Sequence, residues 1–126
     1  MALTRCTVIG LIDAAVSIKV AVNHGKMKNR LGAYHAPAMT FLDFTFLKTL
    51  PTGQIRNGFA ELIKISSVSE LRTWQLLEAH GEALIETSFG RADGAKAEIL
   101  PVADEICRRG IKHMLDVSSV LLGYWR

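Results

Sequence analysis

The sequence has few cysteines, few aromatic residues and no long apolar run. Its only two cysteines, Cys6 and Cys107, belong to no CxxC pair, which argues against a disulfide framework or a zinc ribbon. We expect both to be reduced and buried in an intracellular protein. The apolar run near the N-terminus is interrupted by Asp13 and is too short to cross a bilayer. Nothing near it resembles a signal cleavage region, so the sequence predicts a cytoplasmic protein without a membrane partner.

The usual short motifs of nucleotide and metal sites are also missing. The chain contains no GxGxxG and no GxxxxGK[ST], so the common nucleotide cradles are absent from it. Its histidines form no HExxH or HxxxH pair, which argues against a zinc site built from this chain alone. Aromatic residues make up 7% of the chain and do not alternate with cationic ones, so nucleic acid is not expected as a partner.

The composition is that of an ordinary domain with one local excess of positive charge. With 49% hydrophobic and 21% charged residues in 126, the chain is long enough to bury one modest core. The formal net charge is +3, and the excess lies between Lys19 and Arg30, where there is no Asp or Glu. Such a cluster indicates either an anionic partner or a solvated face, and composition alone favours the solvated face.

The first third of the chain predicts extended structure. Residues 16–23 alternate with period two, which puts Val16, Ile18, Val20 and Val22 on one face and more polar residues on the other. The stretch HGKMKNRLGAYHAP has the Gly, Asn and Pro content of a loop. The stretch MTFLDF that follows predicts a second, mostly buried strand.

A helix is expected over residues 54–66, begun by Pro51 and Thr52. Its apolar face is formed by Ile55, Phe59, Leu62 and Ile63. At about 100° per residue, Asn57, Glu61 and Lys64 gather within roughly 60° on the opposite side. Glu61 and Lys64 are three residues apart, and spacing alone favours an ordinary surface pair over a site.

Two further helices are expected. One runs from about Glu70 to His80, is anchored by Leu71, Trp74 and Leu77, and ends at Gly81, with a short helical piece to Ile85. After a loop at SFGRADGAKA, the last helix covers 97–117, with Pro101 near its first turn. Its core-facing residues are Val102, Ile106, Met114 and Leu115, and Lys112 lies on another side. Strands followed by helices predict an α+β fragment, as at the junction between two domains of a larger protein.

Several polar residues have the chemistry of a site for a phosphorylated polyhydroxyl compound. Ammonium groups are point-charge donors to phosphate and hydroxyl oxygens, while carboxylates and amides accept from hydroxyls. Spacing does not establish that these residues converge. They are Asp13, Lys19, Lys28, Asn29, Glu61, Lys64 and Lys112.

Four ordered stretches resemble the sugar phosphate cyclases, the superfamily that contains dehydroquinate synthase. They are residues 13–19, KNRLGAYH from Lys28, FLKTLP from Phe46 and RNGFAELIK from Arg56. The resemblance implies NAD and a divalent metal, zinc or cobalt, as cofactors, a phosphorylated sugar as substrate, and a homodimer for a full-length member. It also implies that residues 1–52 end an NAD-binding domain and that residues 53–126 begin a helical metal and substrate domain.

The resemblance assigns roles residue by residue. Asp13, Lys19, Lys28 and Asn29 match positions that contact nicotinamide or substrate. Glu61 matches a carboxylate ligand of the metal, and Lys64 matches a substrate-binding lysine one helical turn later. The adenine side of the NAD site is matched by Phe46, Thr49, Leu50 and Gln54. Lys112 aligns with another substrate lysine.

The amino-acid sequence of the first stretch favours one branch of the superfamily. DAAVSIKVAVN stands where dehydroquinate synthases usually read DSSVGGKTGIN. It resembles the branch that cyclises sedoheptulose 7-phosphate with loss of phosphate. Within that branch it favours the demethyl-4-deoxygadusol synthases of mycosporine biosynthesis over 2-epi-5-epi-valiolone synthase. Dehydroquinate synthase, outside the branch, is a further alternative.

The resemblance is incomplete. The family's glycine-rich NAD loop and the GHT-type motif that supplies its metal-binding histidines have no counterpart here. We therefore expect these 126 residues by themselves to be inactive. A non-catalytic, degenerate paralogue that acts as an interaction fragment is the alternative, and exposed apolar surface would favour it.

Overall fold

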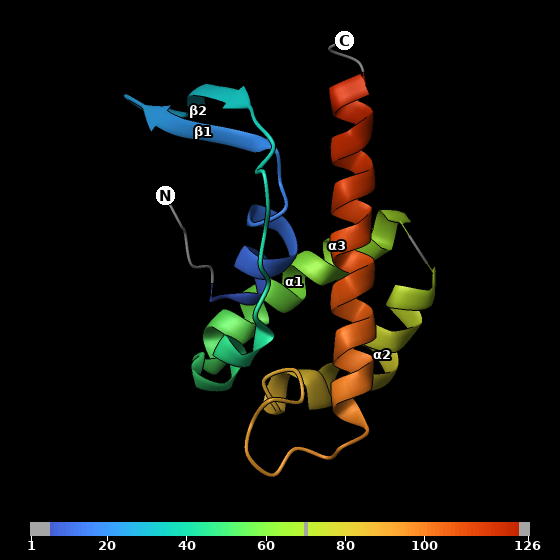
Figure 1. Cartoon of the computed structure of the whole chain (residues 1–126). Helices are drawn as coiled ribbons and strands as arrows, with labels where there is room; N and C mark the ends of the chain where they lie inside the picture. Colours follow the sequence, from blue (N-terminus) through green and yellow to red (C-terminus); the bar gives the residue numbers. More distant parts are fainter. Residues whose placement is uncertain (1–5, 70, 124–126) are drawn as a thin grey trace.

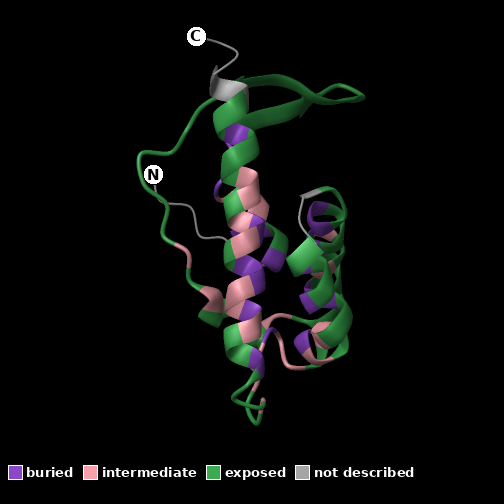
Figure 2. Ribbon diagram, turned by 90° about the vertical axis from the view of Figure 1, so that its right-hand side faces the viewer, coloured by how far each residue is buried: buried purple, intermediate pink, exposed green. Residues whose placement is uncertain are grey.

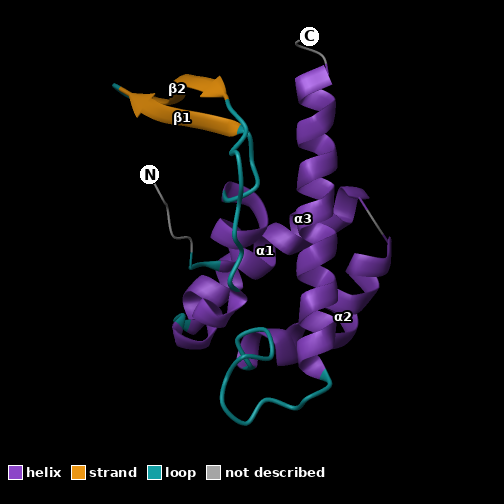
Figure 3. Cartoon of the chain, in the orientation of Figure 1, coloured by secondary structure: helices purple, strands orange, loops and turns teal. Residues whose placement is uncertain are grey.

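Helices packed around one apolar core form most of the structure, and a two-stranded ribbon projects from them (Figures 1 and 3). The computed structural model describes residues 6–69 and 71–123. The order of strands first and helices after confirms the expected α+β fragment. The elements are the π-helix η1 (Gly10–Ala14), β1 (Lys19–His24), β2 (Met27–Tyr34), the 3-10 helix η2 (Phe44–Thr49), α1 (Thr52–Ser69), α2 (Leu71–Glu86) and α3 (Ile99–Gly123).

Helix α1 begins where the sequence predicted, at Thr52 directly after Pro51. Ile55 and Leu62 are fully buried, and Phe59 packs partly buried against the same core. Ile63 is 39% exposed, so its expected place in the core is wrong. The buried stripe instead runs through positions 55, 58, 62 and 65, which share one face of a 3.6-residue helix, and Ile63 lies one residue off that stripe.

Helix α2 continues through Gly81 to Glu86, so the predicted end at Gly81 is wrong. A Cβ at Gly81 would lie 2.8 Å from Cζ of Phe59, which means that the glycine allows α2 to approach α1 closely. Leu77 is buried as expected, but Leu71 and Trp74 are 71% and 41% exposed and do not anchor the helix. The buried residues of α2 are Thr73, Leu76, Leu77 and Leu84.

Helix α3 carries Pro101 in its first turn, where a proline is tolerated because that N–H has no partner inside the helix. Ile106 is fully buried and Met114 packs partly buried against the core, as does Val102. Leu115 is 48% exposed, so its expected core position is wrong. No helix within residues 6–69 and 71–123 is long and apolar enough to span a bilayer.

The chain before α1 packs its first segment against α1 and α3. Val8, Leu11 and Ile12, in and around η1, are buried in the same core as residues of all three α-helices. At the contact with α1, a Cβ on Gly58 would lie 2.6 Å from Cγ1 of Val8, so no larger side chain fits there without a shift. Of the cysteines, Cys107 is buried but Cys6 is exposed, which contradicts its expected burial.

The ribbon of β1 and β2 replaces most of the loop that the sequence predicted over residues 24–37. The strands pair antiparallel from Lys19 opposite Tyr34 to His24 opposite Met27. Gly25, with φ +59°, and Lys26 form the two-residue turn, a conformation that glycine adopts without strain. The Gly and Asn residues of this stretch therefore mark the turn and an irregularity of a β-hairpin, and they do not indicate a long loop.

Both strands are exposed along their whole length (Figure 2). The cross-strand pairs Val20 with Ala33 and Val22 with Leu31 put four apolar side chains on one face of the ribbon. Val20 and Val22 are 49% and 63% exposed. Of the apolar face expected for residues 16–23, only the part before the strand, Val16 and Ile18, is buried.

The buried strand predicted at MTFLDF is also wrong. Phe41 is 88% exposed, and Asp43 caps a 3-10 helix by accepting from the Thr45 backbone N–H at 2.9 Å and from its hydroxyl at 2.6 Å. Side chains three residues apart share a side of a 3-10 helix. Phe44, Leu47 and Leu50 accordingly form an inward row, and Phe46 and Thr49 form an exposed row.

We expect Gly58→Ala to lower the free energy of unfolding by about 1–3 kcal/mol, because overpacking against Val8 outweighs the roughly 1 kcal/mol that alanine adds to helix propensity. Urea denaturation of both proteins measures this. Gly53→Ala is the matched control in α1, since a Cβ there meets nothing within 4 Å. A Gly58→Ala chain as stable as the unsubstituted one would contradict the close contact.

Candidate functional site

Asp13 is placed by the π-helix η1, a rare form that recurs at functional sites. Its backbone carbonyl accepts the N–H groups of Val16 and Ser17 at 3.1 and 2.9 Å, which closes the turn that leads to β1. The side chain is partly buried. Val8 and Ile9, just before η1, pack on α1 at Gly58, and Asp13 lies within electrostatic reach of Glu61 and Lys64 on the same helix.

Glu61 and Lys64 form an ion pair on this stripe, as their spacing suggested. The Glu61 side chain is only 12% exposed, whereas that of Lys64 is 69% exposed. Ion pairs between two exposed side chains contribute little to stability. This pair differs from them because its carboxylate is largely shielded from water. The pair is therefore a charged group held at the edge of the core.

The electrostatics of Asp13 connect η1, β1 and α1. Burial raises the pKa of Asp13, and the negative charge of Glu61 raises it further. The positive charges of Lys64 and Lys19 lower that pKa in part. We call Asp13, Lys19, Glu61 and Lys64 the carboxylate–lysine cluster. The structure thus pairs Glu61 with Lys64 and places Asp13 within electrostatic reach of Glu61, Lys64 and Lys19.

Other predicted site residues lie away from this cluster. Lys28 and Asn29 are near the tip of the ribbon, about four residues, or roughly 13 Å along the strand direction, from Lys19. Asn29 has φ +54°, and its backbone N–H donates to Oδ1 of Asn23 at 3.0 Å. Lys112 on α3 forms an exposed ion pair with Asp116 at 2.7 Å.

The residues predicted for the adenine side of an NAD site follow one another along η2 and the start of α1. Phe46 is 45% exposed and lies with Thr49 in the exposed row of η2. Gln54 is exposed in the first turn of α1. Leu50 is half-buried and belongs to the inward row, so Phe46, Thr49 and Gln54 are the members of this group whose side chains are exposed to a ligand.

A complete metal site does not fit the described residues. No three or more His, Cys, Asp or Glu side chains between Cys6 and Gly123, residue 70 aside, are grouped to hold an ion. Burial raises the pKa of Cys107 to about 12, so this cysteine is a thiol and a poor metal ligand. Glu61 offers one carboxylate, whereas a catalytic zinc site takes three protein ligands.

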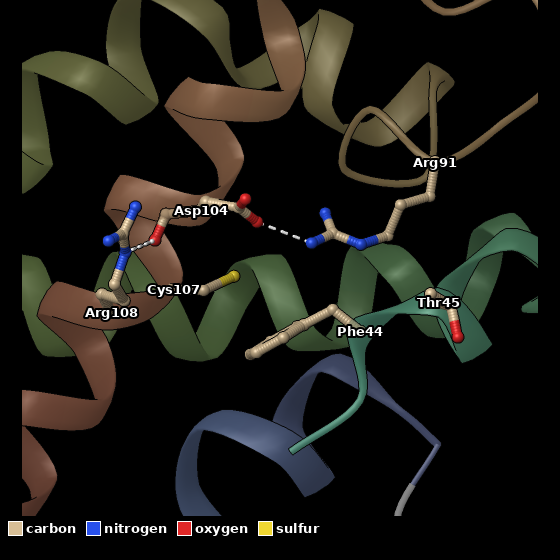
Figure 4. A pocket seen from close by; sticks show the side chains of 6 residues that line it. All are labelled: Phe44, Thr45, Arg91, Asp104, Cys107 and Arg108. Atoms are coloured by element: carbon tan, nitrogen blue, oxygen red, sulfur yellow. Dashed lines mark hydrogen bonds and ion pairs between the residues drawn. The ribbon is translucent and has the colours of Figure 1, made fainter.

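Arg91 is a structural residue that the sequence did not reveal. It follows α2 in the segment that was predicted, correctly, to be a loop, yet its side chain is only 12% exposed. It lines a cavity of about 290 Å³ (Figure 4). The other lining residues are Phe44, Thr45, Asp104, Cys107 and Arg108. A single Arg in a polar loop carries no local signal of burial, because its partners lie elsewhere in the chain.

Comparison with known proteins agrees with this architecture. The family described as 3-dehydroquinate synthase N-terminal matches residues 2–57. A demethyl-4-deoxygadusol synthase from Trichormus variabilis is 55% identical over 112 residues, 89% of this chain and 27% of that protein. A 3-dehydroquinate synthase from Geobacillus thermodenitrificans is 43% identical over 74 residues, 59% of this chain and 20% of that protein.

A solved structure has the same fold. It is a 2-epi-5-epi-valiolone synthase from Streptomyces hygroscopicus with NAD+ and Zn2+ bound, with a TM-score of 0.77 and 37% identity. The match covers 88% of this chain and 28% of that one. In sequence and fold the chain is similar to the dehydroquinate synthase-like sugar phosphate cyclases. It spans about a quarter of the length of the curated relatives it matches.

We expect Asp13→Asn to stabilise the chain at about pH 7. A carboxyl with a raised pKa keeps its proton in the folded state at pH values where the unfolded chain has lost it. Its contribution to the free energy of unfolding therefore falls as the pH rises from about its ordinary pKa of 3.8 to the raised value, and stays low above that. The substitution removes this loss.

Urea denaturation of both proteins between about pH 3 and pH 8 measures the difference. We expect it to be largest at neutral pH and to shrink as the pH approaches 3.8 from above. An Asp13→Asn chain that is less stable at pH 7 would show that Lys19 and Lys64 outweigh burial and Glu61.

Proposed function

We propose that this chain forms part of a sugar phosphate cyclase that converts sedoheptulose 7-phosphate to a cyclic product with loss of phosphate. The demethyl-4-deoxygadusol synthase reaction of mycosporine biosynthesis is the proposed activity. The 55% identity to the Trichormus variabilis protein supports this branch. The sequence DAAVSIKVAVN, which contains Asp13 and Lys19 of the cluster, also supports this branch.

The carboxylate–lysine cluster is the observation that carries the proposal. Lys19 and Lys64 are exposed ammonium groups able to bind the phosphate and hydroxyl oxygens of a sugar phosphate. Asp13 and Glu61 are partly buried carboxylates that can accept hydrogen bonds from hydroxyls or, for Glu61, bind a divalent ion. Opposite charges from η1, β1 and α1 in one place suit a substrate that is anionic at one end and rich in hydroxyls elsewhere.

We propose NAD and a divalent metal, zinc or cobalt, as cofactors. The related valiolone synthase has NAD+ and Zn2+ bound, which supports both NAD and zinc. NAD+, when bound, supplies a hydride acceptor for a substrate carbinol. The exposed row of Phe46 and Thr49, with Gln54, is the proposed contact for its adenine side, and Glu61 is the proposed metal ligand. Further metal ligands must come from outside the described residues.

The arrangement of the site supports a division of the chain at about residue 52. In this proposal, residues 1–52 contribute η1, the ribbon and η2 to the cofactor side, and residues 53–126 contribute the helices of the metal and substrate side. The cluster then lies where the two parts meet. The homodimer expected of a full-length member and a cytoplasmic location also stay predictions.

A 2-epi-5-epi-valiolone synthase is the second candidate. The observation that favours it is the fold similarity to the Streptomyces hygroscopicus enzyme at a TM-score of 0.77. Both candidates are expected to take the same sugar phosphate, so the product distinguishes them. Mass spectrometry of the product is therefore part of the activity test.

The proposal predicts that the 126-residue chain binds zinc weakly, because Glu61 alone cannot replace a three-ligand site. Calorimetric titration with Zn2+ measures the affinity, with Glu61→Gln as the comparison. A submicromolar affinity that disappears in Glu61→Gln would show further ligands, and His24 and His35 would be the first to test.

Activity can be tested by replacing the matching segment of the Trichormus variabilis protein with residues 6–117 of this chain. We expect the chimera to release phosphate from sedoheptulose 7-phosphate, whereas the 126-residue chain alone releases none above background. Glu61→Gln or Lys64→Ala in the chimera should reduce the rate by at least about 100-fold, because each removes a charge placed at the reacting group.

Glu78→Gln, an exposed carboxylate on α2, is the matched control and should leave the rate unchanged. Phosphate release from the 126-residue chain would contradict the need for further residues. A folded chimera that is inactive, or equally active with Glu61→Gln and Lys64→Ala, would contradict the proposed function of the cluster.

A further inference from the structure

The guanidinium of Arg91 joins three segments of the fold (Figure 4). Nη1 donates to the Phe89 carbonyl at 2.7 Å, and Nη2 pairs with Oδ1 of Asp104 on α3 at 2.6 Å. Cζ lies 5.3 Å from the centroid of the Phe44 ring, the distance of a cation–π contact. Because the side chain is only 12% exposed, these contacts are largely shielded from water and outweigh those of a surface arginine.

Phe44 is the first residue of η2 and connects Arg91 to the exposed row of that helix. The inward row holds Phe44 under Arg91 and Leu47 in the core, where Leu47 is fully buried. In a 3-10 helix of six residues, fixing this row also fixes the direction of Phe46 and Thr49. Holding Phe44 therefore sets how the exposed row is presented.

The same charge acts on the cap of η2. Hydrogen bonds from Thr45 hold the pKa of Asp43 below its usual range against a smaller opposing effect of desolvation, and the charge of Arg91 adds a still smaller lowering of that pKa. An ionised Asp43 accepts both Thr45 hydrogen bonds, which keeps the first turn of η2 closed. Arg91 thus contacts the first residue of η2 and also favours the charged form of its capping residue.

A second connection to η2 is weaker. Lys48 of η2 pairs with Asp93, which lies in the same loop as Arg91, at 2.7 Å, but the two side chains are 51% and 88% exposed. Exposed ion pairs contribute little, since water and salt screen them. Of these two ties between the loop after α2 and η2, the one through Arg91 is therefore the stronger.

We propose that Arg91 is a positioning residue for cofactor binding: by stacking on Phe44 while it pairs with Asp104, it fixes η2 so that Phe46 and Thr49 are presented to the adenine side of NAD. The role of the exposed row rests on the function proposed above. The role of Arg91 in fixing η2 stands on the contacts of this chain and is tested separately.

Hydrogen–deuterium exchange of the 126-residue chain tests the positioning. Arg91→Ala should reduce the protection of the amides of residues 47–50 by about tenfold or more and leave the centre of α1 unchanged, because η2 opens locally. Arg91→Lys should not restore protection, since an ammonium cannot make both hydrogen bonds in one plane and stack on Phe44. Arg108→Ala is the matched control, because Arg108 lines the same cavity but its Nε donates to the Asp104 carbonyl on its own helix.

Phe44→Leu shows whether Arg91 acts through the aromatic ring. It keeps an apolar side chain in the inward row, so it should fold like the parent and lose part of the η2 protection. Because Arg91 and Phe44 act in one contact, the double variant Arg91→Ala with Phe44→Leu should lose little more η2 protection than Arg91→Ala alone. Additive losses, unchanged η2 protection, or an equal loss across η2 and α1 would overturn the positioning role.

NAD+ affinity of the chimera, measured by calorimetry, tests the link to the cofactor. Arg91→Ala should raise the dissociation constant by at least about fivefold, because an unfixed η2 must be ordered on binding, whereas Arg108→Ala should not change it. An unchanged affinity with reduced η2 protection would overturn the cofactor part of the proposal. A folded chimera that binds no NAD+ at all would contradict the proposed function instead, and the exchange data alone would then decide the positioning role.

Discussion

The contact between Gly58 of α1 and Val8 is the constraint on which the site depends. The two backbones approach so closely that a single methyl group on Gly58 would overlap Val8. Protein interiors are packed tightly enough that such an overlap moves whole elements. Without the glycine, η1 would sit further from α1, and Asp13 would move away from Glu61 and Lys64. The geometry of the charged cluster is thus set by an apolar contact one helical turn away.

The sequence predicted the parts of the structure that depend on neighbouring residues. The start of α1 after Pro51, its polar stripe and the ion pair of Glu61 with Lys64 follow from helical spacing alone. Where the prediction was wrong, the same residue type is found in two different structural settings. Gly81 resembles a helix end but serves a close contact with Phe59. The stretch before Asp43 resembles a strand, although Asp43 followed by Thr45 is also the pattern of a helix cap.

Other features lay beyond any local pattern. Lys19 joins the cluster and Lys28 does not, because the hairpin places them at opposite ends of the ribbon. Each lies in the same basic stretch of sequence. The burial of Arg91 depends on Asp104 and Phe44, which reach it only through the packing of α3 and η2. Such contacts require the tertiary structure, since no spacing rule connects a loop with a helix that packs across it.

The ribbon of β1 and β2 has a further consequence because a sheet of two strands has no central strand. Each strand leaves one edge of backbone N–H and C=O groups unpaired within the sheet, and such edges are templates for pairing with another chain. The basic residues Lys19, Lys26, Lys28 and Arg30 all lie along this ribbon, and no acidic residue lies among them. Two ribbons that met edge to edge would bring like charges together. The basic stretch therefore opposes self-association of the ribbon at low salt, and this protection weakens as salt screens the charges.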